Sequence, residues 1–256
     1  MIMTADKKIS SQNRIDFLDG LRGLSIIVIV IFHMLYDVGY FFNTDLGFFS
    51  ERFQYPIQLI FPAMFFIVSG ICTAFSRNSV RRGAMLFLLG QAITIITSVF
   101  IPEEIIIFGV ITFIGCSMMI YEFIKHLLNR IPWRIVFIVS LLLYIVLFRV
   151  SDHQQIFLFY KFIDIDFPDN YNYLYPIGIK YSGFYSSDYF PIIPNIFLFI
   201  AGTALSRPIN EKKFPKWFYR MKMPVFNIIG RKSLIIYIVH QPVIFAIMTT
   251  IKFLKG

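Results

Sequence analysis

Residues 14–37 read RIDFLDGLRGLSIIVIVIFHMLYD, a charged opening followed by an apolar run and then a second set of polar residues. Arg22 and His33 are eleven positions apart, three helical turns plus about 20°, so both fall on one helix face, ~16 Å apart along the axis. His33 and Asp37 are i, i+4 neighbours on that same face. Polar residues aligned along one side of an apolar span are costly in a bilayer, so this face is predicted to hold a functional site.

The composition of the chain is that of a protein built in lipid. Of its 256 residues 57% are apolar, 18% are aromatic and 15% are charged, whereas a soluble domain carries about 25% charged residues. We therefore predict an all-α fold, a polytopic bundle of transmembrane helices. Residues 1–13 are predicted to be a cytoplasmic tail and residues 14–256 a single transmembrane domain. About seven spans are predicted, at 20–36, 56–76, 83–100, 105–124, 134–150, 190–206 and 228–250.

Lysine and arginine predict the orientation of these spans. Most of the 24 basic residues lie in 7–22, 77–82, 125–134 and 207–232, on alternating connections, and most acidic residues lie on the other connections. By the positive-inside rule the N-terminus is cytoplasmic and the C-terminus is outside, in a multi-pass protein of the plasma membrane. The net charge of +9 then reflects orientation and lipid contact, and no nucleic-acid partner is expected.

Several polar residues of the first span have both a functional and a plainer interpretation. His33 is either a general base or a hydrogen-bonding link between helices. Asp37 either orients the His33 imidazole or is a loop charge at the membrane surface. Asp19 and Arg22 lie at the cytoplasmic end, where Arg22 is a candidate phosphate ligand. The arginines of the second-to-third connection, Arg77, Arg81 and Arg82, serve either topology or phosphate binding.

Other polar residues inside apolar spans are candidates to line a cavity, although they can equally be satisfied between helices. They are Gln58 and Ser69 in the second span, Thr112 in the fourth, Asn195 at the start of the sixth, and His240 and Gln241 in the last. Cys72 and Cys116 lie inside spans without metal-ligand spacing, so neither a metal nor a disulfide framework is expected.

The longest outer connection, residues 151–189, contains seven of the 14 tyrosines. Such a segment suits either an aromatic belt at the membrane surface or a sugar or glycolipid acceptor. Within it, residues 154–163 are predicted to form a helix lying in the interface.

Five blocks of the chain resemble one known group of proteins. The blocks are 14–37, FFIVSG at 65–70, RRGAMLFLLGQAITIITSVFIPEE at 81–104, SDYFPIIPNIFLFIAG at 187–202 and GRKSLIIYIVHQPV at 230–243. They resemble the bacterial membrane proteins related to the catalytic domain of heparan-α-glucosaminide N-acetyltransferase. The spacing of Arg22 and His33 is also similar to the motif of the membrane acyltransferase type 3 family. Bacterial relatives often have a histidine in place of Thr112 and a tryptophan in place of Asn195.

The resemblance implies a transmembrane acyltransferase. Such an enzyme takes an acyl group from cytoplasmic acetyl-CoA, or another acyl-CoA, and delivers it to an extracytoplasmic glycan, sugar or glycolipid. Carried onto this chain, it matches Arg22 and His33 to the arginine and histidine of the motif. Our hypothesis for the mechanism makes His33 the general base and Asp37 its orienting partner. Arg22 is predicted to hold the acyl-CoA phosphates or to polarise the thioester carbonyl, with help from Arg77, Arg81 and Arg82. Direct transfer and an acyl-histidine intermediate both remain open.

Two other classes of protein fit the same residues. A small transporter or flippase-like protein would use the same intramembrane polar groups to line its path. A purely structural membrane protein predicts instead that His33 and His240 contact different neighbours. The oligomeric state is left open, a homodimer included.

Overall fold

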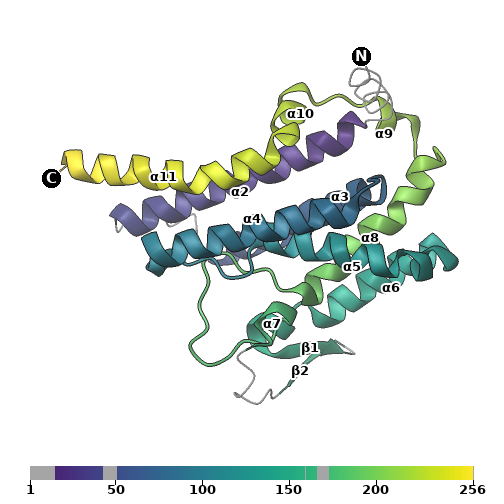
Figure 1. Ribbon diagram of the computed structural model, residues 1–256, viewed down its shortest axis with the longest axis horizontal. Coiled ribbons are helices and arrows are strands. Elements are labelled where there is room, and N and C mark those ends of the chain that lie inside the picture. Colours follow the sequence, from purple (N-terminus) through teal and green to yellow (C-terminus); the bar gives the residue numbers. More distant parts are fainter. Residues whose placement is uncertain (1–14, 43–50, 159, 166–172, 256) are drawn as a thin grey trace. The chain divides into compact units, whose positions relative to one another are not determined.

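The computed structural model describes residues 15–42, 51–158, 160–165 and 173–255 (Figure 1). The predicted tail at residues 1–13 lies outside this part of the chain. Within the described residues, six helices are long and apolar enough to cross a membrane. They are α2 (Asp16–Phe42), α3 (Glu51–Ala74), α4 (Ser79–Phe100), α5 (Val110–Arg130), α8 (Ile192–Asn210) and α11 (Ser233–Lys255). The predicted all-α, polytopic architecture is therefore confirmed.

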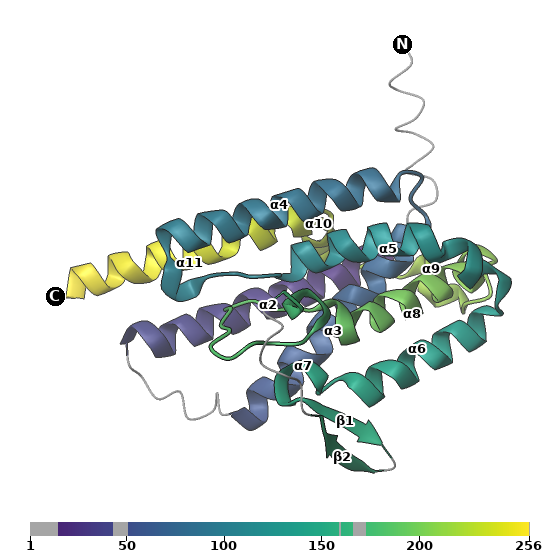
Figure 2. The same cartoon turned by 60° about the horizontal axis from the view of Figure 1, so that its bottom comes forward.

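The fifth predicted span, 134–150, is the shorter apolar helix α6 (Trp133–Leu147). Its 15 residues rise about 22 Å, which is less than the ~30 Å hydrocarbon core. The relative direction of α2 and α11 helps to judge whether α6 also crosses the membrane. Asp19 on α2 contacts Arg231, and His33 further along α2 contacts His240 further along the chain. The helices α2 and α11 therefore run in the same direction, as Figures 1 and 2 show.

Two spans that run in the same direction are separated by an odd number of crossings. The long helices between α2 and α11 are α3, α4, α5 and α8, and these supply an even number. Among the described residues α6 is the apolar helix left for the odd crossing, so the predicted seventh span stays a prediction beside the six long helices. A short helix is accommodated by local thinning of the bilayer at modest cost.

The chain divides into two compact units, residues 1–65 with 212–256 and residues 66–211, with the boundary inside α3. In the first unit, α2 packs against α9 (Lys216–Arg220), α10 (Pro224–Arg231) and α11. Phe17 lies edge-on to Trp217 and Phe218, at ring-centroid distances of 5.5 and 5.2 Å. These contacts attach the start of α2 to the segment that leads into α11.

Glycines allow α2 and α10 to approach backbone to backbone. A Cβ atom built on Gly23 would lie 1.9 Å from the carbonyl oxygen of Phe226, and one on Gly230 would lie 1.9 Å from that of Asp19. No side chain fits at either position, because a backbone carbonyl cannot move aside as a flexible side chain can. Small residues at a helix crossing are the usual means of close packing in membranes.

In the second unit, α4 packs against α5 and α6 packs against α8. The rings of Phe66 and Phe113 lie 4.5 Å apart, and Phe199 is fully buried. Gly70 lies against the carbonyl of Phe199, where a small residue allows close helix packing. A guanidinium closes the C-terminal end of α5: Arg207 donates to the carbonyls of Leu128 and Ile131 at 2.5 and 2.6 Å.

The outer part of this unit corrects one prediction. Residues 154–163 do not form an interfacial helix: β1 (Gln155–Leu158) and β2 (Lys161–Asp164) form an antiparallel hairpin after the short helix α7 (Val150–His153). Its strand pairs are rich in β-branched and aromatic residues, among them Ile156 with Ile163 and Phe157 with Phe162, and such cross-strand pairs stabilise a two-stranded sheet. Cross-strand pairing of these alternating side chains therefore favours a hairpin over a helix at these residues.

The tyrosine-rich segment of the outer connection folds on itself. The ring of Phe184 contacts Tyr175, Tyr181 and Tyr189 at centroid distances of 4.8–5.7 Å. Two hydrogen bonds then attach the segment to the start of α5: Ile107 N–H donates to Ser186 Oγ at 2.8 Å, and Val110 N–H donates to Asp188 Oδ2 at 3.2 Å. The second satisfies the first backbone donor of α5, which otherwise has no partner inside the helix, and the first fixes the connection just before it.

Candidate functional site

Two histidines from the first and last long helices lie against each other inside the first unit. The ring centroids of His33 on α2 and His240 on α11 are 5.2 Å apart, with the ring planes tilted by 57°. We call these two residues the histidine pair. The two rings come from positions more than 200 residues apart in the sequence. Their contact contradicts the expectation of the purely structural interpretation, that each histidine has different neighbours.

A second polar contact joins α2 to α11 beside the histidine pair, one turn after His33 on α2 and one residue after His240 on α11. Gln241 Nε2 donates to Asp37 Oδ2 at 3.0 Å. Asp37 lies inside α2 with 6% of its surface exposed, so its interpretation as a loop charge at the membrane surface is wrong. Among the residues that the structure describes, no donor reaches the buried Oε1 atom of Gln241. The contact fixes the register of the two helices beside the histidine pair.

A backbone carbonyl fixes the orientation of the His240 ring. His240 Nδ1 lies 2.6 Å from the carbonyl oxygen of Tyr237, one turn earlier on α11. Because a carbonyl oxygen can only accept, Nδ1 must carry the hydrogen of this bond. In the neutral ring the other nitrogen, Nε2, then carries a lone pair and no hydrogen.

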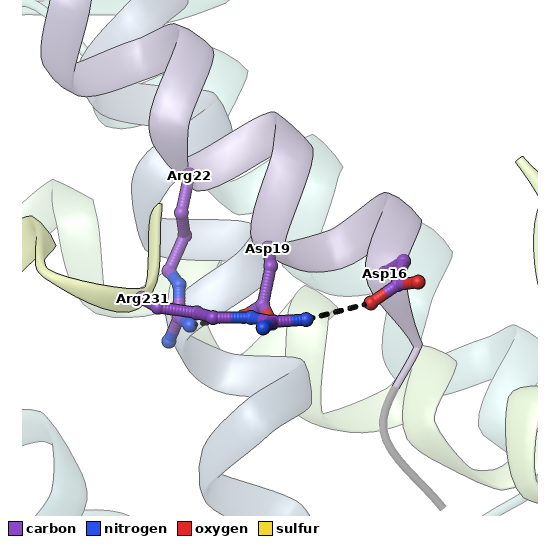
Figure 3. Close-up of polar contacts among 4 residues, drawn as sticks. All are labelled: Asp16, Asp19, Arg22 and Arg231. Atoms are coloured by element: carbon purple, nitrogen blue, oxygen red, sulfur yellow. Dashed lines mark hydrogen bonds and ion pairs between the residues drawn. The ribbon is translucent and has the colours of Figure 1, made fainter. Parts of the chain in front are cut away.

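Four charged residues gather where α2 begins, and Figure 3 shows Arg231 lying across the three residues of α2. Arg22 donates to Asp19 Oδ1 at 2.5 Å, while Arg231 reaches Asp19 Oδ2 at 3.5 Å and Asp16 Oδ1 at 3.1 Å. We call Asp16, Asp19, Arg22 and Arg231 the ionic cluster. The side chain of Asp19 is only 4% exposed, so two guanidinium groups share one buried carboxylate. The Asp19 carboxylate therefore fixes the orientation of the Arg22 guanidinium.

The ionic cluster makes a prediction about stability. We expect Asp19→Asn to lower the free energy of unfolding by about 1–3 kcal/mol, because it leaves Arg22 without its buried counter-charge. Breaking a fully buried ion pair lowers the stability by more than this. Here the side chain of Arg231 is 48% exposed, so solvent screens its interaction with Asp19. Thermal unfolding of the detergent-solubilised protein measures the change. Asp16→Asn is the matched control, since its more exposed ion pair contributes little; an Asp19→Asn protein as stable as the control would contradict the prediction.

The remaining candidate residues have separate surroundings. Gln58 is exposed on α3. The Ser69 carbonyl accepts a hydrogen bond from Thr73 Oγ1 at 2.8 Å, and Asn195 Nδ2 donates to the Pro191 carbonyl at 3.0 Å at the start of α8. Thr112 is 1% exposed and packs against Gly90 of α4. Within the second unit, Asn195 therefore has a hydrogen-bond partner and Thr112 is buried between helices. Their role as cavity-lining residues stays a prediction.

The three arginines between α3 and α4 are exposed. Arg77 lies in the connection, Arg81 and Arg82 lie in the first turns of α4, and Arg82 donates to Ser76 Oγ at 3.1 Å. They belong to the second unit, whereas Arg22 belongs to the first. A common role for the four arginines in binding acyl-CoA stays a prediction.

Sequence reasoning missed two contributors to the site. Arg231 was grouped with the basic residues that set topology, and the carbonyl of Tyr237 carries no sequence signal. Each of the two spans has an arginine followed by a histidine at a similar spacing: eleven residues from Arg22 to His33 and nine from Arg231 to His240. A comparison of the two spans would therefore have pointed to Arg231. Among the described residues, no group of three or more His, Cys, Asp or Glu side chains is arranged to hold a metal ion.

Comparison with protein families adds one finding to this geometry. The model of the family described as heparan-alpha-glucosaminide N-acetyltransferase, catalytic, matches residues 14–242. The matched segment contains the ionic cluster, the histidine pair, Asp37 and Gln241. Neither the comparison with curated proteins nor that with solved structures gives a match.

Proposed function

The chain belongs to the heparan-alpha-glucosaminide N-acetyltransferase catalytic family, and from this we propose that it transfers an acyl group, with acetyl as first choice, from cytoplasmic acyl-CoA to an extracytoplasmic glycan, sugar or glycolipid. Membership of this family supports a multi-pass membrane enzyme of the acyltransferase type. The proposal adds the donor, the acceptor class and a plasma-membrane location.

The observation that carries the proposal is the line of polar groups along α2 and α11. His33 contacts His240, and Asp37, one turn further along α2, contacts Gln241, the residue after His240. Charged and polar groups are costly inside a bilayer and mark functional sites there by default. In the proposed reaction His33 removes the proton from the acceptor hydroxyl or amine while that atom attacks the acyl carbon. Asp37, one turn away on the same face, stabilises the imidazolium that forms.

The ionic cluster supports the binding of the donor. Acyl-CoA carries several phosphate groups, and guanidinium groups bind phosphates with paired hydrogen bonds. Asp19 holds one edge of the Arg22 guanidinium. Among the described residues no acceptor reaches the buried Nε atom of Arg22, so this arginine retains a donor for a ligand. We assign Arg22 to the donor phosphates or to the thioester carbonyl, with Arg77, Arg81 and Arg82 as further phosphate ligands.

Acetyl-CoA binding provides the first test. If the protein binds the donor, acetyl-CoA at 100 times its Kd should stabilise the folded protein by about 2.7 kcal/mol. The measurement is thermal unfolding in detergent with acetyl-CoA, and Arg22→Met should shift the dose response to higher concentration. A wild-type protein that is indifferent to acetyl-CoA would contradict the donor assignment.

The acceptor class is tested separately by mass spectrometry of cell-envelope glycans. Cells that contain the protein should carry an acyl group on a glycan or glycolipid, and cells lacking it should lose that group. Identical acylation of both samples would contradict the acceptor assignment.

A further inference from the structure

We propose that His240 is the proton-accepting partner of His33, so that the histidine pair acts as one proton-carrying unit during acyl transfer. The inference rests on the proposed function and assigns a role to a residue of the last helix. It follows from three observations: the fixed ring of His240, the contact between the two rings, and the polar bond that holds α2 and α11 in register beside them.

The fixed ring gives His240 a defined accepting atom. Its Nδ1–H is committed to the Tyr237 carbonyl at 2.6 Å, so a proton arriving at His240 must bind Nε2. The bond to the Tyr237 carbonyl satisfies the ring N–H, as any buried donor requires, and it leaves Nε2 as the atom that binds an added proton. A ring that receives a proton needs this arrangement, because the bond at Nδ1 both orients the imidazole and stabilises its charged form.

The contact between the rings makes transfer within the pair short. At a centroid distance of 5.2 Å and a tilt of 57°, the rings are not stacked face to face. We route the proton between the two rings through one bridging water. A proton shared by two imidazoles spreads its charge, which lowers the cost of a cation within a membrane span. The Asp37 carboxylate, held by Gln241 at 3.0 Å, supplies the opposite charge one turn away.

The proposed step balances without another reactant. The acceptor oxygen or nitrogen forms a bond to the acyl carbon and loses its proton to His33. The carbon–sulfur bond breaks and coenzyme A leaves as the thiolate. The proton passes to His240 while the bond to sulfur breaks, and it then returns through the pair to the thiolate sulfur. The histidine pair ends in its starting protonation state, and one proton has moved from the acceptor to the thiol.

The test compares His240→Gln with His240→Ala, using labelled acetyl-CoA and the glycan fraction extracted from cells that lack the protein. Glutamine can still form hydrogen bonds between the helices, but it cannot carry a proton. We expect both variants to transfer acetyl at least about tenfold more slowly than wild type, with little change in the KM for acetyl-CoA. Added imidazole should restore transfer to His240→Ala, where it fits the vacated space, and not to His240→Gln.

Controls separate this inference from the proposed function. No transfer by the wild-type protein would overturn the proposed function itself. Transfer by wild type and by His240→Gln at equal rates, or no response of His240→Ala to imidazole, would overturn the role of His240 alone. Elution volume and thermal unfolding report whether each variant is folded; if His240→Ala is not, the rate of His240→Gln decides. His126→Ala, at an exposed histidine of α5, should behave as wild type.

Discussion

Replacing His33 by alanine is expected to slow acyl transfer by about 10²–10⁴-fold, the usual contribution of a general base. The amount of protein in the membrane and its elution from a sizing column should not change, because alanine is an excellent helix former and α2 keeps its glycine contacts with α10. The imidazole is the group of α2 that contacts His240, with the ring centroids 5.2 Å apart. Its loss removes the base and leaves the donor site intact.

The measurement is acetyl transfer to the extracted glycan fraction, with acetyl-CoA binding followed by thermal unfolding as a second readout. We expect His33→Ala to lose transfer and keep binding. His126→Ala serves as the matched control, since it removes an exposed histidine from another span. An active His33→Ala protein would rule out the general-base assignment, and the proposal for His240 would fall with it.

The second large effect is expected on folding, from Gly23→Ala. The added methyl group would lie 1.9 Å from the carbonyl oxygen of Phe226, well inside van der Waals contact, so α2 and α10 must move apart. We expect a loss of about 3 kcal/mol or more in the free energy of unfolding, at the upper end for an overpacked contact. Because α10 leads directly into α11, this separation should also disturb the histidine pair and reduce transfer.

Gly20→Ala is the control for this substitution, because it lies three residues earlier on the same helix. A Cβ atom there meets the side chains of Met223 and Asn227, not a backbone carbonyl, and Met223 can adopt another rotamer. Thermal unfolding and the yield of monodisperse protein compare the two variants. If Gly23→Ala were as stable as Gly20→Ala, the close approach of the α2 and α10 backbones would not hold.

The helices were predictable because their apolar runs are long and bounded by polar connections. Where boundaries differ, a contact with a distant segment of the chain decides. The first span was predicted to end at residue 36, but α2 continues to Phe42, since Asp37 is held by Gln241 of another helix. The fourth span was predicted to begin at residue 105, but α5 begins at Val110, where Asp188 accepts the first backbone donor. Hydropathy detects neither partner.

The candidate site was predictable only in part. Arg22, His33 and Asp37 share a helix, so helical periodicity places them on one face. His240 was recognised as a polar residue inside a span, but periodicity cannot say which helix it contacts. The pairing of Arg22 with Asp19 follows from i, i+3 spacing, whereas the addition of Arg231 depends on α10 crossing α2 at Gly23 and Gly230.

The sequence by itself determined that this is a membrane protein of about seven spans, that its first span carries an arginine, a histidine and an aspartate in line, and that it resembles a family of acyltransferases. The first two properties follow from composition and from distances along one helix, and the third follows from the resemblance of five sequence blocks. Only the tertiary structure decided that His240 and Gln241 are the partners of His33 and Asp37, and that 155–164 is a hairpin. The physical reason is that contacts between distant segments depend on how closely two backbones approach, and at α2 that approach is set by glycines whose effect no local pattern reveals.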